Sequence, residues 1–454
     1  MKAVSPETLA EWSGGGLLQP GRTLPSGIVG TDTRNIVPGS LFVALRGERF
    51  AGHDFLDHAA AAGAAALMVS NDGPWPENVS IIKVRDTLAG LQQLATAWRK
   101  AWSGLVIGLT GSNGKTSTKD LTSAILAQRW SVNATRGNLN NHIGCPLTML
   151  ATGPEHAVAV VEMGMNHPGE IAPLAAIAAP DAAIITNIGT AHIEHMGSRE
   201  AIALEKGMLA EAVGGGGCVV LNAGDDYTPR IAQRCSAQVL TAGIDAGDIR
   251  LTGLTTGPQG SRFVLHLPDG SATPVALPVP GIHMAANAAL AAAAAFHLGL
   301  RGEEIADGLA SARLNKGRLQ MRHAAGLTII DDSYNANPDS MRAALDTLLT
   351  FPCEGKRIAV LGRMGELGEH SADAHRELGR QTHERGCTLA IVRDGDAPLI
   401  AEGYVAAGGS HQNVHDFPDH HSCAAWLRGF ATPSDLILLK GSRSAAMEKV
   451  ADNL

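Results

Sequence analysis

The sequence predicts an α/β protein of three domains: a small N-terminal α/β domain, a central parallel sheet with a phosphate-binding loop, and a C-terminal Rossmann-like α/β domain. Three observations lead to this prediction. The chain has 454 residues, which corresponds to about three domains. From residue 104 to about 312, apolar runs alternate with helical patterns, as in parallel sheets covered on both faces. The same alternation begins again near Leu314.

The N-terminal unit, residues 1–84, contains short apolar runs separated by polar turns. We expect a helix over His53–Ala62 and strands at Gly27–Asp32, Ser40–Leu45 and Ala64–Ser70. Arg85–Ala101 follows with leucines and a tryptophan at spacings of three to four residues, which predicts an amphipathic helix. This helix is expected to connect the first unit to the second.

The central unit, residues 85–313, alternates strands and helices before its pattern changes. The expected strands are Leu105–Leu109, Ala157–Glu162, Ala182–Thr186 and Gly217–Leu221, and the expected helices between them are Thr118–Trp130, Pro168–Ala178, Ser198–Ala212 and a segment near 228–235. Residues 249–279 change to a period of two with glycine turns, which indicates antiparallel ribbons. Helices over 283–298 and 302–311 are expected to close this unit.

The C-terminal unit, residues 314–454, repeats the alternation. Its expected strands are Thr328–Ile330, Arg357–Leu361, Thr388–Val392 and Leu436–Leu439. Helical patterns lie between them, so we predict a second open α/β domain.

Composition excludes several classes of function. The formal net charge is -8, and no basic block stands out, which argues against a nucleic-acid partner. Six scattered cysteines form no C-x-x-C pair, so reduced thiols in a cytoplasm fit best. No signal peptide is recognised, and the Ala-rich segment 285–298 is too short to span a bilayer. We therefore expect a cytoplasmic protein without a membrane partner.

The most informative segment is Thr110–Thr118, with the sequence TGSNGKTST, between a predicted strand and a predicted helix. Gly111 and Gly114 allow a tight turn, and the N–H groups at the start of the helix can surround an anion. Lys115 can reach the outer phosphates of a nucleotide, and the Thr116 hydroxyl can bind Mg²⁺. The spacing is shorter than in the common P-loop, which weakens a generic kinase or GTPase interpretation. The alternative is a glycine-rich turn that binds nothing.

Two further strand ends carry groups that could bind cations. Glu162 follows the apolar run AVAVV, where a P-loop enzyme places a metal-binding acid. His192 follows the next strand and can bind a second cation as a neutral imidazole, although a solitary histidine is more often a loop or core residue. His195 lies three residues further on, so a pair of histidine ligands is possible. Ligands of parallel sheets bind at such strand ends.

Two polar loops and one lysine complete the candidates. The loop 331–338 contains Asp332, Tyr334, Asn335 and Asn337, and the loop 137–141 contains three asparagines; both suggest a binding edge, and both could be simple turns. Lys206 lies in a helical pattern that, taken alone, indicates an ordinary helical lysine.

Together these segments resemble the Mur ligases, the ATP-dependent amide-bond-forming enzymes of peptidoglycan precursor synthesis. The loop Thr110–Thr116 has the superfamily's form. Asp331–Met341 (DDSYNANPDSM), Gly137–Leu147 (GNLNNHIGCPL), and the N-terminal strings at Thr31–Arg34 and Pro38–Gly47 are most similar to the branch that adds D-alanyl-D-alanine to a UDP-N-acetylmuramoyl-tripeptide. The similarity extends through all three units.

The resemblance implies a role for each matching residue. ATP would be held by Gly111, Ser112, Asn113, Gly114, Lys115, Thr116, Ser117, Asn287, Arg318 and Asp332. Two Mg²⁺ ions are implied, the first held by Thr116 and Glu162 and the second by His192 and an N-carbamylated Lys206. The uridine nucleotide would contact Thr33, Arg34, Leu45, Arg46 and Gly47, and the peptide substrates would contact Asn140, Asn141, Asn335 and Asn337.

The implied reaction transfers the γ-phosphoryl group of ATP to a peptide carboxylate, and the amine of D-alanyl-D-alanine then displaces phosphate from the acyl phosphate. A monomer is expected. Three positions depart from the family pattern: Met208, Met284 and Arg363. Two alternatives stay open, namely a Mur ligase that adds a single amino acid and a small-molecule kinase or nucleotide-gated binding module. The sequence leaves open whether the third residue of the acceptor peptide is diaminopimelate or lysine.

Overall fold

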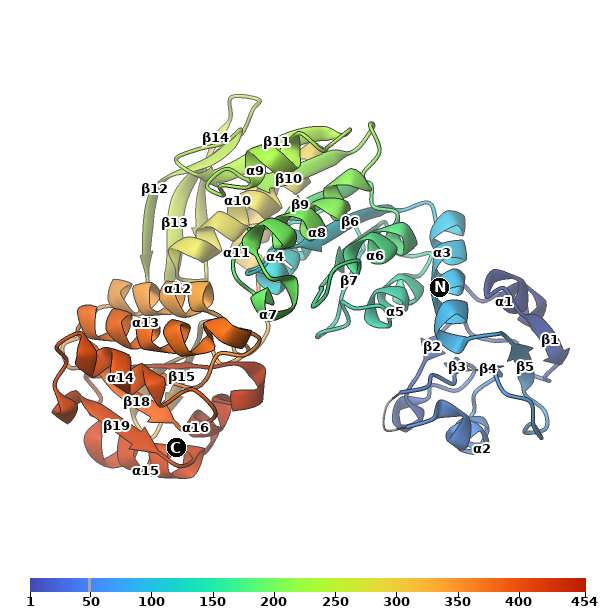
Figure 1. Ribbon diagram of the computed structural model, residues 1–454. Helices are drawn as coiled ribbons and strands as arrows, with labels where there is room; N and C mark the ends of the chain where they lie inside the picture. Colours follow the sequence, from blue (N-terminus) through green and yellow to red (C-terminus); the bar gives the residue numbers. More distant parts are fainter. Residues whose placement is uncertain (48–49) are drawn as a thin grey trace.

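The computed structural model describes residues 1–47 and 50–454 and contains three β-sheets, each with helices packed against it (Figure 1). The N-terminal and C-terminal sheets lie on opposite sides of the central one. The predicted three-domain α/β fold class is confirmed. The exact domain boundaries near residues 84 and 313 stay a prediction.

The N-terminal sheet has five strands in the order β1-β5-β4-β3-β2, of which only the β1–β5 pair is antiparallel. The strands are β1 (Gly16–Gln19), β2 (Val29–Gly30), β3 (Leu41–Val43), β4 (Ala66–Val69) and β5 (Ser80–Lys83), and the helices are α1 (Pro6–Trp12), α2 (Leu56–Ala61) and the short 3-10 turns Thr33–Asn35 and Gly52–Phe55. The sequence pattern did not predict β1 and β5. The predicted helix over His53–Ala62 is divided into a 3-10 turn and α2.

Helix α3 (Thr87–Ala101) connects the first sheet to the second, as predicted. Asp86 caps its N-terminus by accepting a hydrogen bond from the Ala89 N–H, at 2.7 Å. The Trp98 indole is buried and donates to the Thr152 carbonyl of the central unit, at 2.8 Å. The apolar face of α3 therefore packs against the central domain.

The central sheet has nine strands in the order β14-β13-β12-β11-β10-β9-β6-β8-β7. Strands β6 to β12 pair in parallel, and β13 and β14 continue the same sheet as an antiparallel ribbon, which confirms the predicted change of pattern. The strands are β6 (Leu105–Thr110), β7 (Val132–Ala134), β8 (Val158–Glu162), β9 (Ala182–Ile185), β10 (Cys218–Asn222), β11 (Gln238–Ile244), β12 (Ile249–Gly257), β13 (Gly260–His266) and β14 (Ala272–Leu277).

Helices cover both faces of this sheet because its strands are apolar on both sides. Alternate residues of β6 belong to different hydrophobic cores: Ile107 packs on one face of the sheet and Val106 on the other. One face is covered by α4 (Lys115–Leu126), α10 (Ile282–His297) and α11 (Gly302–Ser311), and the other by α5 (Gly144–Ala151), α6 (Ile171–Ala178) and α8 (Arg199–Glu211). Two short helices, α7 (Ile193–Met196) and α9 (Thr228–Ala232), lie in loops. The Ala-rich segment forms the buried helix α10, as its small side chains allow close packing.

The C-terminal sheet has six strands in the order β15-β16-β20-β17-β18-β19, with only β15 antiparallel to its neighbour. The strands are β15 (Gln320–Ala324), β16 (Leu327–Asp331), β17 (Arg357–Leu361), β18 (Thr388–Val392), β19 (Val414–Phe417) and β20 (Leu436–Lys440). The helices are α12 (Pro338–Thr350), α13 (Ser371–Glu384), α14 (Leu399–Ala406), α15 (His420–Phe430), α16 (Glu448–Asp452) and 3-10 turns at Gly368–His370, His411–Asn413 and Arg443–Ala445.

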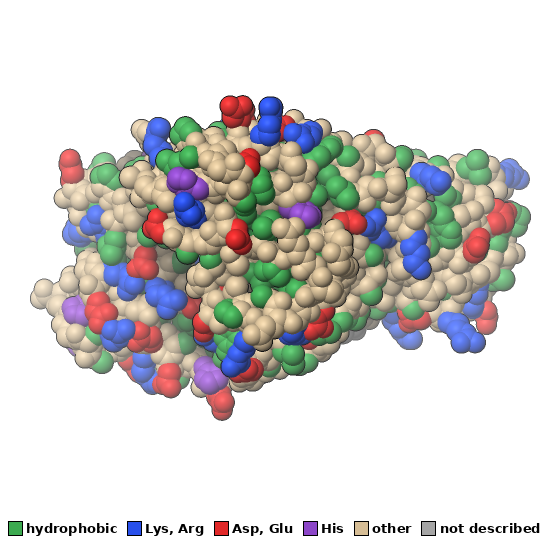
Figure 2. Space-filling view, turned by 90° about the horizontal axis from the view of Figure 1, so that it is seen from above, with side chains coloured by type: hydrophobic (Ala, Val, Ile, Leu, Met, Phe, Trp, Pro, Cys, Tyr) green, Lys and Arg blue, Asp and Glu red, His purple; other side chains and the backbone are tan. Residues whose placement is uncertain are grey.

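The outer surface carries charges of both signs. On the face seen in Figure 2, lysine and arginine side chains are interspersed with aspartates and glutamates. Among the described residues, no helix has the length and apolar character needed to cross a bilayer.

Candidate active site

The phosphate-binding loop joins β6 to α4 at the carboxyl edge of the central sheet. Gly111 has φ +151°, and a Cβ there would lie 1.8 Å from the Thr186 hydroxyl oxygen. Gly114 has φ +78°, and a Cβ there would lie 2.6 Å from the Asn287 side-chain oxygen. Both positions therefore require glycine. Helix α4 begins at Lys115, three residues before the start that the sequence pattern predicted, so the lysine belongs to its first turn.

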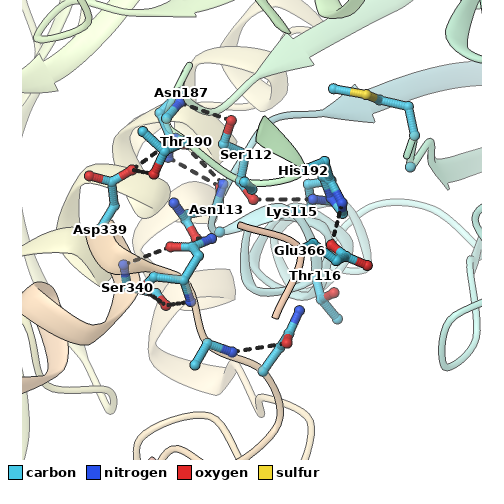
Figure 3. Close-up of a pocket in the computed structure, with 18 of the residues that line it drawn as sticks. Ser112, Asn113, Lys115, Thr116, Asn187, Thr190, His192, Asp339, Ser340 and Glu366 are labelled. Atoms are coloured by element: carbon cyan, nitrogen blue, oxygen red, sulfur yellow. Dashed lines mark hydrogen bonds and ion pairs between the residues drawn. The ribbon is translucent and has the colours of Figure 1, made fainter. Parts of the chain in front are cut away.

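A neighbouring strand end holds this loop in place. Asn187, which follows β9, accepts hydrogen bonds from the Ser112 N–H through its carbonyl and from the Asn113 N–H through its side chain, each at 2.9 Å (Figure 3). The Gly189 N–H donates to the Ser112 hydroxyl at 2.8 Å. Sequence reasoning missed the role of Asn187 in fixing the loop, because that role depends on the pairing of β6 with β9.

A cleft of 1560 Å³ opens between the central and C-terminal domains beside this loop. Most of the predicted site residues line it: Ser112, Asn113, Gly114, Lys115, Thr116, Ser117, Asn140, Asn141, Glu162, His192, Asn287, Arg318, Asp332, Asn335 and Asn337. Residues that lie up to some 220 positions apart in the sequence therefore line the same cleft. Gly111 does not line the cleft but shapes the loop beneath it.

The predicted uridine-nucleotide residues are not brought to this cleft. Thr33 and Arg34 lie in a 3-10 turn of the N-terminal domain, where the exposed Arg34 pairs with Asp32 at 2.6 Å. Leu45, Arg46 and Gly47 follow β3 in the same domain, and the last two are exposed.

Glu162 ends β8 and is buried in the floor of the cleft. Its Oε1 accepts a hydrogen bond from Asn140 at 2.9 Å, and its Oε2 has no partner among the described residues. The Thr116 hydroxyl accepts a hydrogen bond from the Arg318 guanidinium at 2.9 Å. A buried carboxylate oxygen without a donor, close to a loop hydroxyl, is a donor set suited to a hard cation such as Mg²⁺.

The environment of Lys206 differs from that of the ordinary helical lysine that the sequence pattern indicated. Lys206 lies in α8, but its side chain is fully buried, and its ammonium nitrogen has no hydrogen-bond partner among the described residues. Burial lowers the pKa of Lys206 well below its usual value, and the nearby Lys115 charge lowers it further. The pattern suggested an ordinary helical lysine because periodicity does not show which side of a helix meets another charged residue. The structure instead places a buried amine with a lowered pKa, which favours its neutral form.

His192 lies between the two domains. Its ring Nδ1 is 2.6 Å from Oε2 of Glu366, which belongs to the C-terminal domain. Burial lowers the pKa of His192, which favours the neutral imidazole. The His195 ring stacks instead on His167, with ring centroids 4.5 Å apart. The two histidines considered as a possible ligand pair thus have different neighbours.

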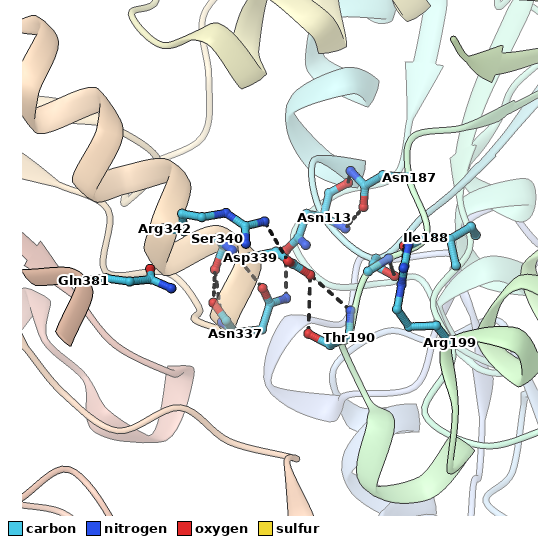
Figure 4. A network of polar contacts seen from close by, with 12 residues as sticks. Asn113, Asn187, Ile188, Thr190, Arg199, Asn337, Asp339, Ser340, Arg342 and Gln381 are labelled. Atoms are coloured by element: carbon cyan, nitrogen blue, oxygen red, sulfur yellow. Dashed lines mark hydrogen bonds and ion pairs between the residues drawn. The ribbon is translucent and has the colours of Figure 1, made fainter. Parts of the chain in front are cut away.

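The loop before α12 brings the C-terminal domain onto the phosphate-binding loop (Figure 4). The Asn337 side-chain amide donates to the Asn113 side-chain oxygen at 2.7 Å. Asp339 accepts hydrogen bonds from the Thr190 N–H at 3.1 Å and from its hydroxyl at 3.3 Å. Asn337 also caps α12, so one residue both starts the helix and crosses the domain boundary.

The cleft-lining residues of the C-terminal domain are fixed by a second lysine. The buried Lys440 ammonium pairs with the Asp332 carboxylate at 2.5 Å and donates to the Asn335 carbonyl at 3.1 Å. The Arg318 guanidinium lies 4.3 Å from the centre of the Tyr334 ring. Sequence reasoning missed Lys440, because only the parallel pairing of β16 with β20 brings it beside Asp332.

Two of the three departures from the family pattern lie on the walls of the site. Met284 lines the cleft with its sulfur 3.8 Å from the Asn287 amide nitrogen. Arg363 lines it too and lies 3.7 Å from Asp394. Met208 faces Arg234 on the other side of α8.

Family models match along nearly the whole chain. They are the Mur ligase family, catalytic domain at 26–99, the Mur ligase middle domain at 109–295, and the Mur ligase, glutamate ligase domain at 317–443. Relatives named UDP-N-acetylmuramoyl-tripeptide--D-alanyl-D-alanine ligase are 37% identical in Bacillus subtilis and 38% identical in Escherichia coli, covering 94% and 93% of this chain and 92% of each relative. The chain belongs to the Mur ligase family.

Solved structures support the assignment of this Mur ligase. A crystal structure of MurF from Acinetobacter baumannii matches with a TM-score of 0.90 and 34% identity over 100% of this chain and 99% of that one. MurF ligase from Thermotoga maritima in complex with ADP matches with a TM-score of 0.83 and 30% identity over 94% and 96%. A folylpolyglutamate synthase from Mycobacterium tuberculosis shares the fold at 18% identity and a TM-score of 0.64, over 80% of this Mur ligase and 92% of the synthase.

Proposed function

We propose that this Mur ligase joins D-alanyl-D-alanine to UDP-N-acetylmuramoyl-tripeptide at the expense of ATP, giving the pentapeptide precursor of peptidoglycan. One observation carries the proposal. Three features converge on a single cleft: a phosphate-binding loop, a buried carboxylate whose Oε2 has no partner among the described residues, and the asparagine loop of the C-terminal domain. The names of the relatives that cover more than nine tenths of the chain support the choice of substrates.

In this proposal each domain binds a different substrate. Residues 1–84 bind the uridine nucleotide through Thr33, Arg34, Leu45, Arg46 and Gly47. Residues 85–313 bind ATP, and residues 314–454 close over it and bind the incoming dipeptide. The two exposed arginines, Arg34 and Arg46, suit a diphosphate because their guanidinium groups can each donate two parallel hydrogen bonds.

ATP is bound at the loop between β6 and α4. The N–H groups of Gly114 to Ser117, where α4 begins, face the phosphates, and the Lys115 ammonium moves to them from the carbonyls of Gly111 and Ser112, to which it donates at 2.8 and 3.3 Å. Asn287, Arg318 and Asp332 contact the remainder of the nucleotide. The cationic groups offset the repulsion between the triphosphate and the attacking peptide carboxylate.

Two Mg²⁺ ions fit the donor set. Thr116 and Glu162 hold the first, and His192 with a carbamylated Lys206 holds the second. When bound, the ions neutralise charge that develops on the transferred phosphoryl group. The unpartnered Oε2 of Glu162 and the neutral ring of His192 are both available for this purpose.

Carbamylation of Lys206 follows from its environment. A neutral amine is a nucleophile, and burial keeps this amine neutral at lower pH than in water. Its lone pair attacks the carbon of CO₂, an N–C bond forms, and one proton leaves the nitrogen for solvent. The product is a carbamate anion, so a lysine becomes an oxygen donor. No co-reactant other than CO₂ is required.

The peptide end of the reaction needs neutral polar groups and exclusion of water. Asn140 and Asn141 on the central side, with Asn335 and Asn337 on the C-terminal side, present amides that can orient peptide carbonyls without competing as charges. The γ-phosphoryl group is transferred to the tripeptide carboxylate, and the dipeptide amine then displaces phosphate. Contact between Asn337 and Asn113 closes the cleft against water, which would hydrolyse the acyl phosphate.

We further propose that the enzyme acts as a monomer in the cytoplasm, where ATP is available. All six cysteines are free, which agrees with a reducing compartment.

The decisive assay is phosphate release with purified substrates. Release should require ATP, a UDP-N-acetylmuramoyl-tripeptide and D-alanyl-D-alanine together, and the tripeptide should be tried with diaminopimelate and with lysine as its third residue. Release with a single amino acid in place of the dipeptide would indicate another Mur ligase activity. Release that ignores the dipeptide and all amino acids would indicate a kinase or nucleotide-gated module and contradict the proposal.

A second assay addresses Lys206. Lys206→Ala should abolish turnover, and short carboxylic acids should restore part of it by replacing the carbamate. Activity close to that of the unaltered enzyme in Lys206→Ala would exclude a metal-binding role for this residue.

A further inference from the structure

Glu366 is a C-terminal-domain residue that contacts a side chain of the central domain inside the cleft. Its Oε2 lies 2.6 Å from Nδ1 of His192, which is only 17% exposed. Neither the periodicity of the sequence nor the proposed roles above give Glu366 a function. The contact is drawn in Figure 3, where the two side chains meet beside Lys115.

Backbone packing fixes the position of this carboxylate. The Glu366 carbonyl accepts a hydrogen bond from the Glu194 N–H at 3.3 Å, so the backbones of the two domains are also joined next to the side-chain contact. The neighbouring Leu367 is 3% exposed, and a Cβ on Gly368 would lie 3.0 Å from Glu194. Glu366 is therefore held against α7 (Ile193–Met196) by its surroundings.

Both contacting residues have an unusual backbone conformation. His192 has φ +64° and Glu366 has φ +59°, the left-handed region that non-glycine residues rarely adopt. Each such residue costs about 1–2 kcal/mol, and such conformations persist where the surrounding structure imposes them, often at functional sites. Two of them meet across this domain boundary, so the surrounding structure holds both residues in place at the contact.

The chemistry of the two groups determines which nitrogen is protonated. An ionised carboxylate only accepts hydrogen bonds, so the 2.6 Å contact of Glu366 Oε2 with His192 Nδ1 favours the tautomer that carries its proton on Nδ1. A neutral imidazole with its proton on Nδ1 has its lone pair on Nε2, which is the form that binds a metal.

We propose that Glu366 is a positioning residue that fixes the tautomer and ring orientation of His192, so that approach of the C-terminal domain completes the second metal site. This inference rests on the proposed role of His192 as a metal ligand. The inference gives Glu366 no direct role on the nucleotide. In the structure the Lys115 ammonium donates to the carbonyls of Gly111 and Ser112 rather than to Glu366.

The tautomer can be measured directly in the free enzyme. With ¹⁵N-labelled histidine, the ring nitrogen shifts of His192, assigned by comparison with His192→Gln, should show a proton on Nδ1 in the unaltered enzyme. Glu366→Ala should give a mixture of both tautomers. The matched control is Glu369→Ala, which removes a 90% exposed carboxylate three residues away on the same loop and should leave the His192 signals unchanged.

Metal affinity gives a second readout that does not depend on turnover. Mn²⁺ binding is followed by electron paramagnetic resonance with saturating β,γ-methylene-ATP. Loss of a carboxylate that orients a metal-binding histidine typically weakens metal binding about 10- to 100-fold, so we expect this loss for the weaker Mn²⁺ in Glu366→Ala. Glu366→Gln, which keeps an acceptor oxygen, should lose less, and Glu369→Ala should lose nothing.

Three other results would overturn the inference. Unchanged Mn²⁺ affinity in Glu366→Ala, with weakened binding in His192→Gln, would leave the proposed function intact and refute only the positioning role. Unchanged affinity in His192→Gln would refute the proposed metal ligand as well. A loss in Glu366→Gln as large as that in His192→Gln would make Glu366 a metal ligand itself.

Discussion

Replacing Lys206 by methionine should stabilise the metal-free protein while abolishing its activity. The Lys206 side chain is fully buried, and its nitrogen has no hydrogen-bond partner among the described residues. Burying a polar group without a partner costs about 1–3 kcal/mol in protein mutational data. Methionine has a similar length and no such group, so Lys206→Met should raise the free energy of unfolding by this amount. A functional lysine is thus retained at a cost in stability.

The gain should depend on pH in a defined direction. The pKa of Lys206 in the folded state is well below 10.5, its usual value in the unfolded chain. Between these two values the unfolded state binds one proton more than the folded state, so the stability of the unaltered protein rises with pH. The limiting slope is about 1.4 kcal/mol for each pH unit. Lys206→Met lacks this dependence, so its advantage should be largest near neutral pH and shrink toward pH 10.

Thermal unfolding in CO₂-free and metal-free buffer measures the effect. For a unit the size of the central domain, 1 kcal/mol corresponds to about 2–4 °C in the unfolding midpoint. Lys119→Met is the matched control, since the equally buried Lys119 donates to the Thr135 carbonyl at 2.8 Å and pairs with Asp120 at 2.9 Å. It should lower the midpoint. A similar decrease in Lys206→Met, or a gain that is the same at pH 7 and pH 9.5, would refute the reasoning.

Three other substitutions test the loop and the domain linker. Gly111→Ala forces a Cβ to within 1.8 Å of the Thr186 hydroxyl and should weaken binding of β,γ-methylene-ATP about 10- to 100-fold by calorimetry; unchanged affinity would mean that the loop is not the phosphate site. Lys115→Ala should lower the rate of phosphate release by about 10²- to 10³-fold, and unaltered turnover would contradict its role. Asp120→Ala removes the carboxylate that accepts hydrogen bonds from the Asn315 backbone N–H at 3.2 Å and from its side-chain amide at 3.0 Å. It should lower the free energy of unfolding by about 1 kcal/mol and raise the KM for ATP. Asp307→Ala on α11 is the control and should change neither quantity.

Long, strongly apolar segments were predictable from sequence, and short edge strands were not. Strands β6, β8, β9 and β10 lie inside the central sheet, so both of their faces are apolar and they appear as continuous runs. In contrast, β1, β7, β15 and β19 are edge strands of three to five residues, with mixed polarity and no periodic pattern. Their pairing depends on neighbours far away in sequence. Most interior strands of the central and C-terminal sheets were therefore identified from the sequence, whereas interior β5 and β11 were missed along with these edges.

The same reason separates the parts of the candidate site. Gly111, Gly114 and Lys115 were recognisable because one continuous loop carries both the turn and the charge. Glu162 was recognisable because a carboxylate directly after a buried strand must lie at the carboxyl edge. Asn187 and Lys440 were not, since their partners come from strands that are adjacent in the sheet and distant in the chain.

The sequence by itself determined the class of fold, the phosphate-binding loop and the family to which the chain belongs, because these reside in contiguous motifs whose backbone requirements are local. Only the tertiary structure decided that Lys206 is buried with no partner among the described residues and that Glu366 meets His192 across the domain boundary. Burial and charge proximity are properties of space rather than of sequence order. They lower the pKa of the Lys206 amine and bring a carboxylate to one nitrogen of the His192 ring, and the proposed chemistry depends on both.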